Sequence, residues 1–193
     1  YYMELTYGCN LEAKDYSPDN LELNKEYVMG GLVVEAKTLT SKTGSQFGIL
    51  KIEDYSGAAE LRLFGQDFIN YNKYGVVGSA IMVTLSAAKG KYNDRIYTSI
   101  RGIQLLENVQ GQVISGIQLN MTEQDACNEQ VEAVLDEYIR PGDKNGRSLY
   151  VSIENAKEQK PVLMSSPERI VLNRDLLLRL DELGVEYDIK TMA

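Results

Sequence analysis

Two adjacent carboxylates, Glu53 and Asp54, are the first residues of this 193-residue chain whose types and spacing suggest chemistry. They open the segment EDYSG, which lies between two apolar-rich runs. Paired carboxylates can bind Mg²⁺ or act as general acid and base. Adjacent residues of a strand point to opposite faces of a sheet, however, so these two side chains are poorly placed to bind one ion. We therefore predict that Asp54 accepts backbone hydrogen bonds in a turn and that Gly57 supplies a permissive backbone there.

The chain contains no His, and its two cysteines, Cys9 and Cys127, are isolated in the sequence. Most general bases, activated nucleophiles and metal sites depend on imidazole, so catalytic triads and zinc hydrolysis are excluded within these residues. Two isolated thiols fit a reducing cytoplasm better than a disulfide framework. No apolar run approaches the roughly 18 residues of a membrane span, and no signal-peptide pattern opens the chain. We expect a cytoplasmic protein with no catalytic residue, metal ion or cofactor in this chain.

Strand-like segments surround the two carboxylates. Residues 27–40, 46–54 and 58–64 predict three strands, residues 65–75 a short helix, and residues 79–90 and 95–107 two more strands. The Gly30-Gly31 pair indicates a bend or bulge in a long first strand. Three strands, a helix and two strands is the order of an OB-fold, an all-β, five-stranded Greek-key barrel.

The pattern changes after Gln110-Gly111. We predict strands at 113–121, 148–155, 160–166 and 185–192, a helix at 121–140 capped by Thr122 and ended by Pro141-Gly142, and a helix at 174–184 stopped by Gly184. Strands interleaved with two helices predict a small α/β (α+β) domain. The chain therefore divides into a lead-in at 1–25 without a core of its own, an OB-fold at 26–108 and a C-terminal α/β domain at 109–193.

Charge is unevenly distributed along the chain, which has a net charge of −8. Residues 1–25 carry 2 basic and 5 acidic side chains (net −3), residues 26–108 carry 9 and 8 (net +1), and residues 109–193 carry 9 and 15 (net −6). The total argues against a protein that binds nucleic acid over its whole surface. The middle segment is nevertheless close to neutral, so the local placement of its basic residues decides what it can bind.

Period-two alternation separates two faces in the second and third strands. Aliphatic residues that should fill the barrel are Gly48, Leu50, Ile52, Leu61 and Leu63, whereas the outward set is Phe47, Ile49, Lys51, Glu53, Glu60, Arg62 and Phe64. OB-folds bind single strands on this outward face, with the loops after strands one and four as flanking arms. The predicted nucleic-acid-binding residues are Lys37 and Lys42 in the first arm, Phe47, Lys51 and Arg62 on the sheet, and Lys89, Lys91, Tyr92 and Arg95 in the second arm.

The same residues allow a second interpretation. Lys and Arg on a sheet can simply keep it soluble, and Phe47 can pack against a neighbouring domain. The neighbouring carboxylates of Glu53, Glu60 and Asp94 weaken any affinity for phosphate. The acidic helix at 123–137 is either a partner surface or a solvated face. The residues alone therefore leave open a protein-interaction OB domain without nucleic-acid binding and an RNA- or tRNA-binding OB module.

Residues 29–65, MGGLVVEAKTLTSKTGSQFGILKIEDYSGAAELRLFG, resemble the OB domain of the bacterial DNA polymerase III alpha subunit, the C-family replicative polymerase. The resemblance rests on five motifs in order: a GGLV-type strand, a TKxG-type turn, a strand ending in (L/I)ED, an SG corner and a strand ending in LF. In this chain the same motifs are, in that order, Gly31-Leu32-Val33, Ser41-Lys42-Thr43-Gly44, Ile52-Glu53-Asp54, Ser56-Gly57 and Leu63-Phe64. Ser41 departs from the common Thr or Lys. Residues 169–184, RIVLNRDLLLRLDELG, are similar to the final helix of the family.

The resemblance implies a non-catalytic C-terminal fragment of a DNA-directed DNA polymerase, a nucleotidyltransferase whose catalytic aspartates and Mg²⁺ lie in a palm domain upstream. It implies that the OB domain binds single-stranded template DNA during replication. It also implies that the C-terminal domain contacts the clamp-loader tau subunit and other holoenzyme subunits, with no membrane partner. Because the chain opens with Tyr1 rather than Met, we expect it to be a piece of a longer protein.

Overall fold

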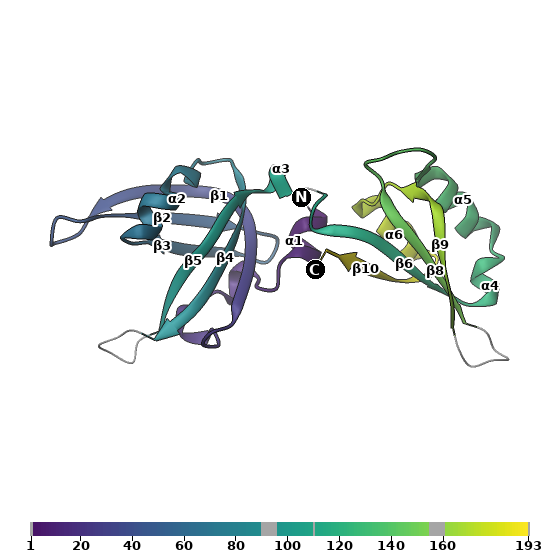
Figure 1. The fold of residues 1–193 in the computed structure, drawn as a ribbon, viewed down its shortest axis with the longest axis horizontal. Helices are drawn as coiled ribbons and strands as arrows, with labels where there is room; N and C mark the ends of the chain where they lie inside the picture. The colour runs from purple at the N-terminus through teal and green to yellow at the C-terminus, as the bar shows by residue number, and fades with distance from the viewer. Residues whose placement is uncertain (1, 90–95, 110, 155–160, 193) are drawn as a thin grey trace. The chain divides into compact units, whose positions relative to one another are not determined.

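A computed structural model describes residues 2–89, 96–109, 111–154 and 161–192 (Figure 1). The chain forms two compact units, Met3–Gln110 and Gly111–Ala193. The described residues are mostly β, and each unit contains one five-stranded sheet. None of the helices in these residues is both long enough and apolar enough to cross a membrane.

The N-terminal unit contains the elements that the sequence predicts, in the predicted order. Helix α1 (Tyr2–Gly8) and the 3-10 helices η1 (Ala13–Asp15) and η2 (Pro18–Asn20) come first, followed by β1 (Glu26–Thr40), β2 (Gln46–Glu53) and β3 (Ala58–Leu63). Next come α2 (Gln66–Tyr71), η3 (Asn72–Tyr74), β4 (Ala80–Lys89), β5 (Ile96–Leu105) and α3 (Leu106–Val109). Three strands, a helix and two strands are thus confirmed.

All neighbouring strands of the first sheet are antiparallel, in the order β3-β2-β1-β4-β5. Strand β1 pairs with β4 over its first half and with β2 over its second half, with a bulge between Val33 and Glu35. The bulge therefore follows the Gly30-Gly31 pair instead of lying at it. Gly31 instead allows the backbone of Glu53 to approach β1 closely, because a Cβ on Gly31 would lie 2.3 Å from the carbonyl oxygen of Glu53.

Strand pairing does not close this sheet into a barrel among the described residues, because β3 and β5 have no ladder between them. The lead-in lies at this gap: η1 contacts β3, η2 contacts β5, and the Tyr16 hydroxyl hydrogen-bonds Thr98 Oγ1 at 3.1 Å. Leu11, Ala13 and Leu21 of the lead-in belong to the core of the N-terminal unit. The lead-in is thus part of the fold that carries the candidate site.

The inward face of β2 and β3 is aliphatic, as alternation predicts. Leu50, Ile52, Leu61 and Leu63 are fully buried in the core. Helix α2 packs against the same inward face, because a Cβ on Gly48 would lie 3.3 Å from Phe68 of that helix. The residues at alternate positions therefore point away from the core, on the opposite face of the sheet.

The C-terminal unit is a mixed sheet with helices in its crossovers (Figure 1). Its elements are β6 (Ile114–Met121), α4 (Glu123–Ala126), α5 (Glu129–Tyr138), β7 (Ile139–Arg140), β8 (Arg147–Glu154), β9 (Pro161–Ile170), α6 (Arg174–Glu182) and β10 (Glu186–Thr191). The strand order is β10-β6-β8-β9-β7, with β6 and β8 parallel and the other pairs antiparallel. Leu119 of β6 and Leu176 and Leu180 of α6 are fully buried.

The helix predicted at 121–140 is two helices. Thr122 caps the first one in a capping box with Asp125, which confirms the predicted cap. Asn128 starts the second helix by accepting a hydrogen bond from the Gln130 N–H at 2.9 Å, and that helix ends at Tyr138 because the next residues pair with β9. Gly184, with a φ of +71°, follows α6 as predicted.

Candidate nucleic-acid interface

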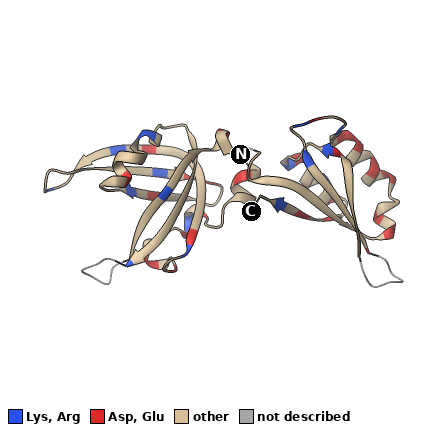
Figure 2. Ribbon diagram, viewed as in Figure 1, with Lys and Arg blue, Asp and Glu red and all other residues tan. Residues whose placement is uncertain are grey.

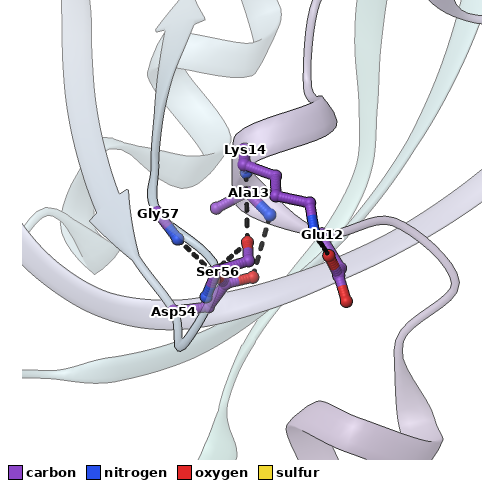
Figure 3. A network of polar contacts seen from close by, with 6 residues as sticks. All are labelled: Glu12, Ala13, Lys14, Asp54, Ser56 and Gly57. Atoms are coloured by element: carbon purple, nitrogen blue, oxygen red, sulfur yellow. Dashed lines mark hydrogen bonds and ion pairs between the residues drawn. The ribbon is translucent and has the colours of Figure 1, made fainter.

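Asp54 holds the corner between β2 and β3 through four hydrogen bonds (Figure 3). Its Oδ1 accepts from the Ser56 N–H, the Ser56 hydroxyl and the Gly57 N–H, at 2.7, 2.6 and 3.0 Å. Its Oδ2 accepts from the Ala13 N–H of the lead-in at 2.8 Å. The predicted role as a backbone acceptor is confirmed, and the carboxylate also ties the lead-in to the sheet.

The environment of Asp54 favours its ionised form. Burial raises the pKa of this carboxyl, but the hydrogen bonds from Ser56, Ala13 and Gly57 outweigh burial, so its pKa lies below the ordinary value. Gly57 does not have the positive φ that a permissive backbone implies. A Cβ on Gly57 would instead lie 3.3 Å from Lys14 Cβ, so glycine lets the lead-in approach the corner closely.

Glu53 points to the other face of the sheet, where its carboxylate lies 3.7 Å from Lys51 Nζ. The two adjacent carboxylates therefore do not converge on one ion. Within the described parts of the chain, no group of three or more His, Cys, Asp or Glu side chains is placed to hold a metal. The corner positions strands, and the candidate site lies on the outward face beside it.

That outward face consists of three cross-strand rows on β1, β2 and β3. From the corner outward, the rows are Glu35, Lys51 and Glu60; Lys37, Ile49 and Arg62; and Leu39, Phe47 and Phe64, the last residue lying just after β3. The aromatic rings of Phe47 and Phe64 stack with their centroids 5.1 Å apart and an angle of 25° between the planes. We call this set of nine residues, together with Glu53, the outward face.

Every basic side chain of the outward face is paired with a carboxylate two residues away on its own strand. Lys37 pairs with Glu35, Lys51 with Glu53, and Arg62 Nε with Glu60 Oε1 at 2.9 Å. The hydrogen bond from Lys37 lowers the pKa of the Glu35 carboxyl. Three basic and three acidic side chains give a net charge of zero, and Figure 2 shows both signs along these strands. The attraction of this face for phosphate is correspondingly small.

Exposed apolar surface remains at the third row. The Phe64 side chain is 56% exposed and Leu39 is 42% exposed, although both lie beside the half-buried Phe47. Aromatic faces exposed on a sheet can stack on nucleobases. Phe64 is absent from the binding residues predicted from the sequence. Alternation assigns it to the outward face, but its contact with Phe47 depends on the hairpin register, which alternation does not give.

The predicted arm residues do not gather with the sheet residues. Lys37 lies within β1, opposite Ile49, and is therefore part of the outward face instead of an arm. Lys42 lies in the turn between β1 and β2, and Lys89 ends β4. These two lysines are at opposite ends of β1, whose first residue pairs with Ser86 and whose last pairs with Gln46. The other predicted arm residues, Lys91, Tyr92 and Arg95, lie outside the described residues.

A groove of about 540 Å³ lies between β3 and β5, beside the exposed ring of Phe64. Tyr16 and Pro18 of the lead-in line it, together with Arg62 of β3 and Tyr97 of β5. The groove follows from the gap between these two strands. It adjoins the outward face, because Glu60, Arg62 and Phe64 also line it.

Comparison with known proteins finds matches over somewhat less than two thirds of the chain. No protein-family profile matches it. The DNA polymerase III subunit alpha of Haemophilus influenzae is 20% identical over 123 residues, which are 64% of this chain and 10% of that protein. This chain is similar to the DNA polymerase III alpha subunit. The subunit alpha of Vibrio cholerae is 21% identical over 121 residues, which are 63% of the chain and 10% of that protein.

The resemblance to the alpha subunit that the residues predict is confirmed by these matches. The matched stretch spans about a tenth of the length of each curated relative. A match of 123 residues is longer than either structural unit, so it includes residues of both. The similarity to the alpha subunit is therefore not confined to the sheet that carries the outward face.

Proposed function

We propose that this chain is a non-catalytic C-terminal part of a DNA polymerase III alpha subunit that acts in DNA replication in the bacterial cytoplasm. Its N-terminal unit is an OB-fold that binds single-stranded template DNA. Its C-terminal unit tethers the polymerase to other holoenzyme subunits, including the clamp-loader tau subunit. The observation that carries the DNA-binding part is the stacked Phe47–Phe64 pair on the outward face, in which the Phe64 ring is exposed.

The OB-fold assignment is supported by the topology of the N-terminal unit. A long first strand pairs with both β2 and β4, and the helix between β3 and β4 packs under the sheet. OB-folds are partly open Greek-key barrels, so the unpaired edges of β3 and β5 are compatible with the fold. The lead-in at the gap, with Tyr16 bonded to Thr98, takes the place of strand pairing there.

The proposed binding mode is stacking with little phosphate attraction. A base stacked on an aromatic side chain contributes roughly 1–3 kcal/mol. The basic residues of the outward face are engaged by its carboxylates, so few phosphate contacts release counterions. Each phosphate contact to a single strand contributes about 0.7 to the slope of log K against log salt. We therefore expect weak affinity for the strand, with a slope of about 1 or less.

The test is a titration of a fluorescent dT oligonucleotide, roughly 12 nucleotides long to fit one OB-fold, with the 193-residue chain. We expect Phe47→Ala and Phe64→Ala each to weaken binding by roughly 5- to 150-fold, as the loss of one stacking contact predicts. Ile69→Ala is the control, because Ile69 is exposed on α2, which packs on the inward face. Equal binding by all four proteins would refute the proposed interface.

The tethering part rests on the similarity to the alpha subunit, which includes residues of the C-terminal unit. Size-exclusion chromatography of the chain with purified tau subunit tests it, and co-elution is the expected result. Separate elution at concentrations above about 10 µM, where specific complexes of ordinary affinity form, would contradict the tethering role.

A protein-interaction OB domain is the second candidate. The net charge of zero on the outward face favours it, because nucleic-acid interfaces are usually strongly positive. It predicts that the Phe47–Phe64 pair is covered by another protein subunit and that no oligonucleotide binds even at low salt. The dT titration therefore separates the two candidates, since only the single-strand binder binds the oligonucleotide and loses affinity for it in the Phe64→Ala variant.

A further inference from the structure

The exposed end of β9 is an apolar feature of the C-terminal unit that the proposed DNA-binding role does not use. Residues 161–165 are all exposed, and within them Val162 is 48%, Leu163 61% and Met164 45% exposed. Three consecutive large apolar side chains are thus open on both faces of the sheet. A surface of this kind marks an interaction site or an aggregation hazard.

One edge of this part of β9 has no partner strand among the described residues of its unit. Strand β8 occupies the other edge, from Pro161 opposite Glu154 to Ser165 opposite Tyr150. The short strand β7 pairs with β9 only at Arg169 and Ile170, at the far end. The backbone groups of β9 that point away from β8 over residues 161–166 are therefore open to another chain.

The position of Pro161 indicates which backbone groups these are. Proline is tolerated in an edge strand where its nitrogen faces away from the ladder, because it has no N–H to donate. Residues two and four positions later direct their backbone groups to the same side. If the nitrogen of Pro161, the first residue of β9, faces away from β8, the N–H and C=O groups of Leu163 and Ser165 point to the open edge.

This edge has none of the charged residues that protect an exposed edge from pairing. The sequence from Pro161 to Pro167, PVLMSSP, contains no Lys, Arg, Asp or Glu. Glu154 lies opposite Pro161, and α4, which contacts β8, carries Glu123 and Asp125, whereas Lys160 directly precedes Pro161 in the sequence. Figure 2 shows acidic residues along the ribbon of α4 and α5, and residues 109–193 have 15 acidic and 9 basic residues.

We propose that the open edge of β9 binds an extended segment of a partner protein as an added strand, and that this segment alternates apolar with basic residues. An extended backbone is the ligand that satisfies the N–H and C=O groups of Leu163 and Ser165. Apolar side chains of the added strand contact Leu163 on one face or Val162 and Met164 on the other, and its basic residues are attracted by the acidic residues of α4 and α5. Pairing with a second copy is disfavoured, because two such units repel each other.

This inference deepens the proposed tethering role and rests on it only for the identity of the partner. The first probe is a capped peptide of about six alternating Lys and Val residues, the length of one typical strand. Amide hydrogen exchange of the full chain is measured with and without this peptide. We expect slower exchange at Leu163 and Ser165. The same peptide N-methylated at alternate nitrogens, which removes its backbone donors, should give no protection, and a Glu-Val peptide should give less.

The matched variants are Leu163→Lys, which places a charge on the edge, and Leu178→Lys, which makes the same change at an exposed residue of α6. Both should leave the melting temperature unchanged, and only Leu163→Lys should abolish protection by the peptide. Absence of protection in the unmodified chain overturns the proposal. A dimer in sedimentation that Leu163→Lys dissociates overturns it too, since the edge would then bind a second copy.

Binding of the tau subunit separates this inference from the proposed function. Loss of tau binding in Leu163→Lys but not in Leu178→Lys supports both. Tau binding that Leu163→Lys leaves intact keeps the tethering role and overturns the edge as its contact. Peptide protection at β9 without any tau binding supports the edge and refutes the tethering role.

Discussion

Replacing Asp54 by Ala should destabilise the N-terminal unit more than any other single change of a surface carboxylate in it. The substitution removes the acceptor of four hydrogen bonds, from Ser56, Gly57 and Ala13. A hydrogen bond to a charged group contributes about 1.5–3 kcal/mol, but water reaches part of this corner and replaces some of the lost bonds. We expect the free energy of unfolding to fall by about 2–3 kcal/mol, less than the sum of four separate bonds.

The assay is urea unfolding of the full chain followed by NMR amide signals, so that the C-terminal unit serves as an internal reference. Glu53→Ala is the matched control, because Glu53 is the neighbouring carboxylate and makes only an exposed ion pair with Lys51. Such a pair contributes about 0.5 kcal/mol or less. Equal losses for the two variants, or a loss below about 0.5 kcal/mol for Asp54→Ala, would show that the corner does not depend on this carboxylate.

The pH dependence provides a second measurement on the same residue. The pKa of Asp54 is lower in the folded chain than its ordinary value, so the unfolded chain binds the proton more tightly. The stabilisation is therefore complete above the unfolded pKa of about 3.9 and is lost as the pH falls through the lowered folded pKa. The difference in unfolding free energy between the native chain and Asp54→Asn should shrink between about pH 5 and pH 2. A constant difference over that range would contradict the assigned hydrogen bonds.

Three further changes test other parts of the structure. Gly31→Ala should lower the melting temperature of the N-terminal unit, since its Cβ would lie 2.3 Å from a backbone oxygen, whereas Gly102→Ala, with open space around the Cβ, should have little effect. Burial and, to a smaller extent, the charge of Asp54 raise the pKa of the Cys9 thiol to about 12. Iodoacetamide at pH 8 should therefore label the exposed Cys127 and leave Cys9 unmodified until the chain unfolds. Replacing the glutamates of the outward face by Gln should strengthen oligonucleotide binding, because three basic residues are released from their ion pairs. The slope of log K against log salt should increase by up to about 2. An unchanged slope would show that the three basic residues face no phosphate.

Local sequence patterns predicted the features that depend on residues close together in the chain. Alternation separated the buried Leu50 from the outward Lys51, and Asp54 was identified as a turn acceptor from the residues that follow it. Thr122 was recognised as a cap for the same reason. The break in the following helix was missed, although Asn128 belongs to a residue type that favours caps over helix interiors.

Features that depend on pairing between distant segments could not be predicted in this way. The Phe47–Phe64 contact requires the register of β2 and β3, and the burial of Leu11 requires the lead-in to return to the sheet. Leu163 is exposed in a part of β9 that β7 does not pair with, although its segment resembles a buried strand in composition. Ion pairing of Lys37 with Glu35 was implicit in their spacing, but its consequence for phosphate binding depends on all three pairs together.

Photo-crosslinking tests the proposed DNA-binding role most directly. A 5-bromodeoxyuridine oligonucleotide, roughly 12 nucleotides long, is irradiated with the full chain, and the modified peptides are identified by mass spectrometry. We predict adducts on the peptides that contain Phe47 and Phe64, and loss of those adducts in the Phe64→Ala variant. Adducts confined to the C-terminal unit, or none above the level seen with an unfolded control, would contradict the assignment of the outward face as a single-strand binding site.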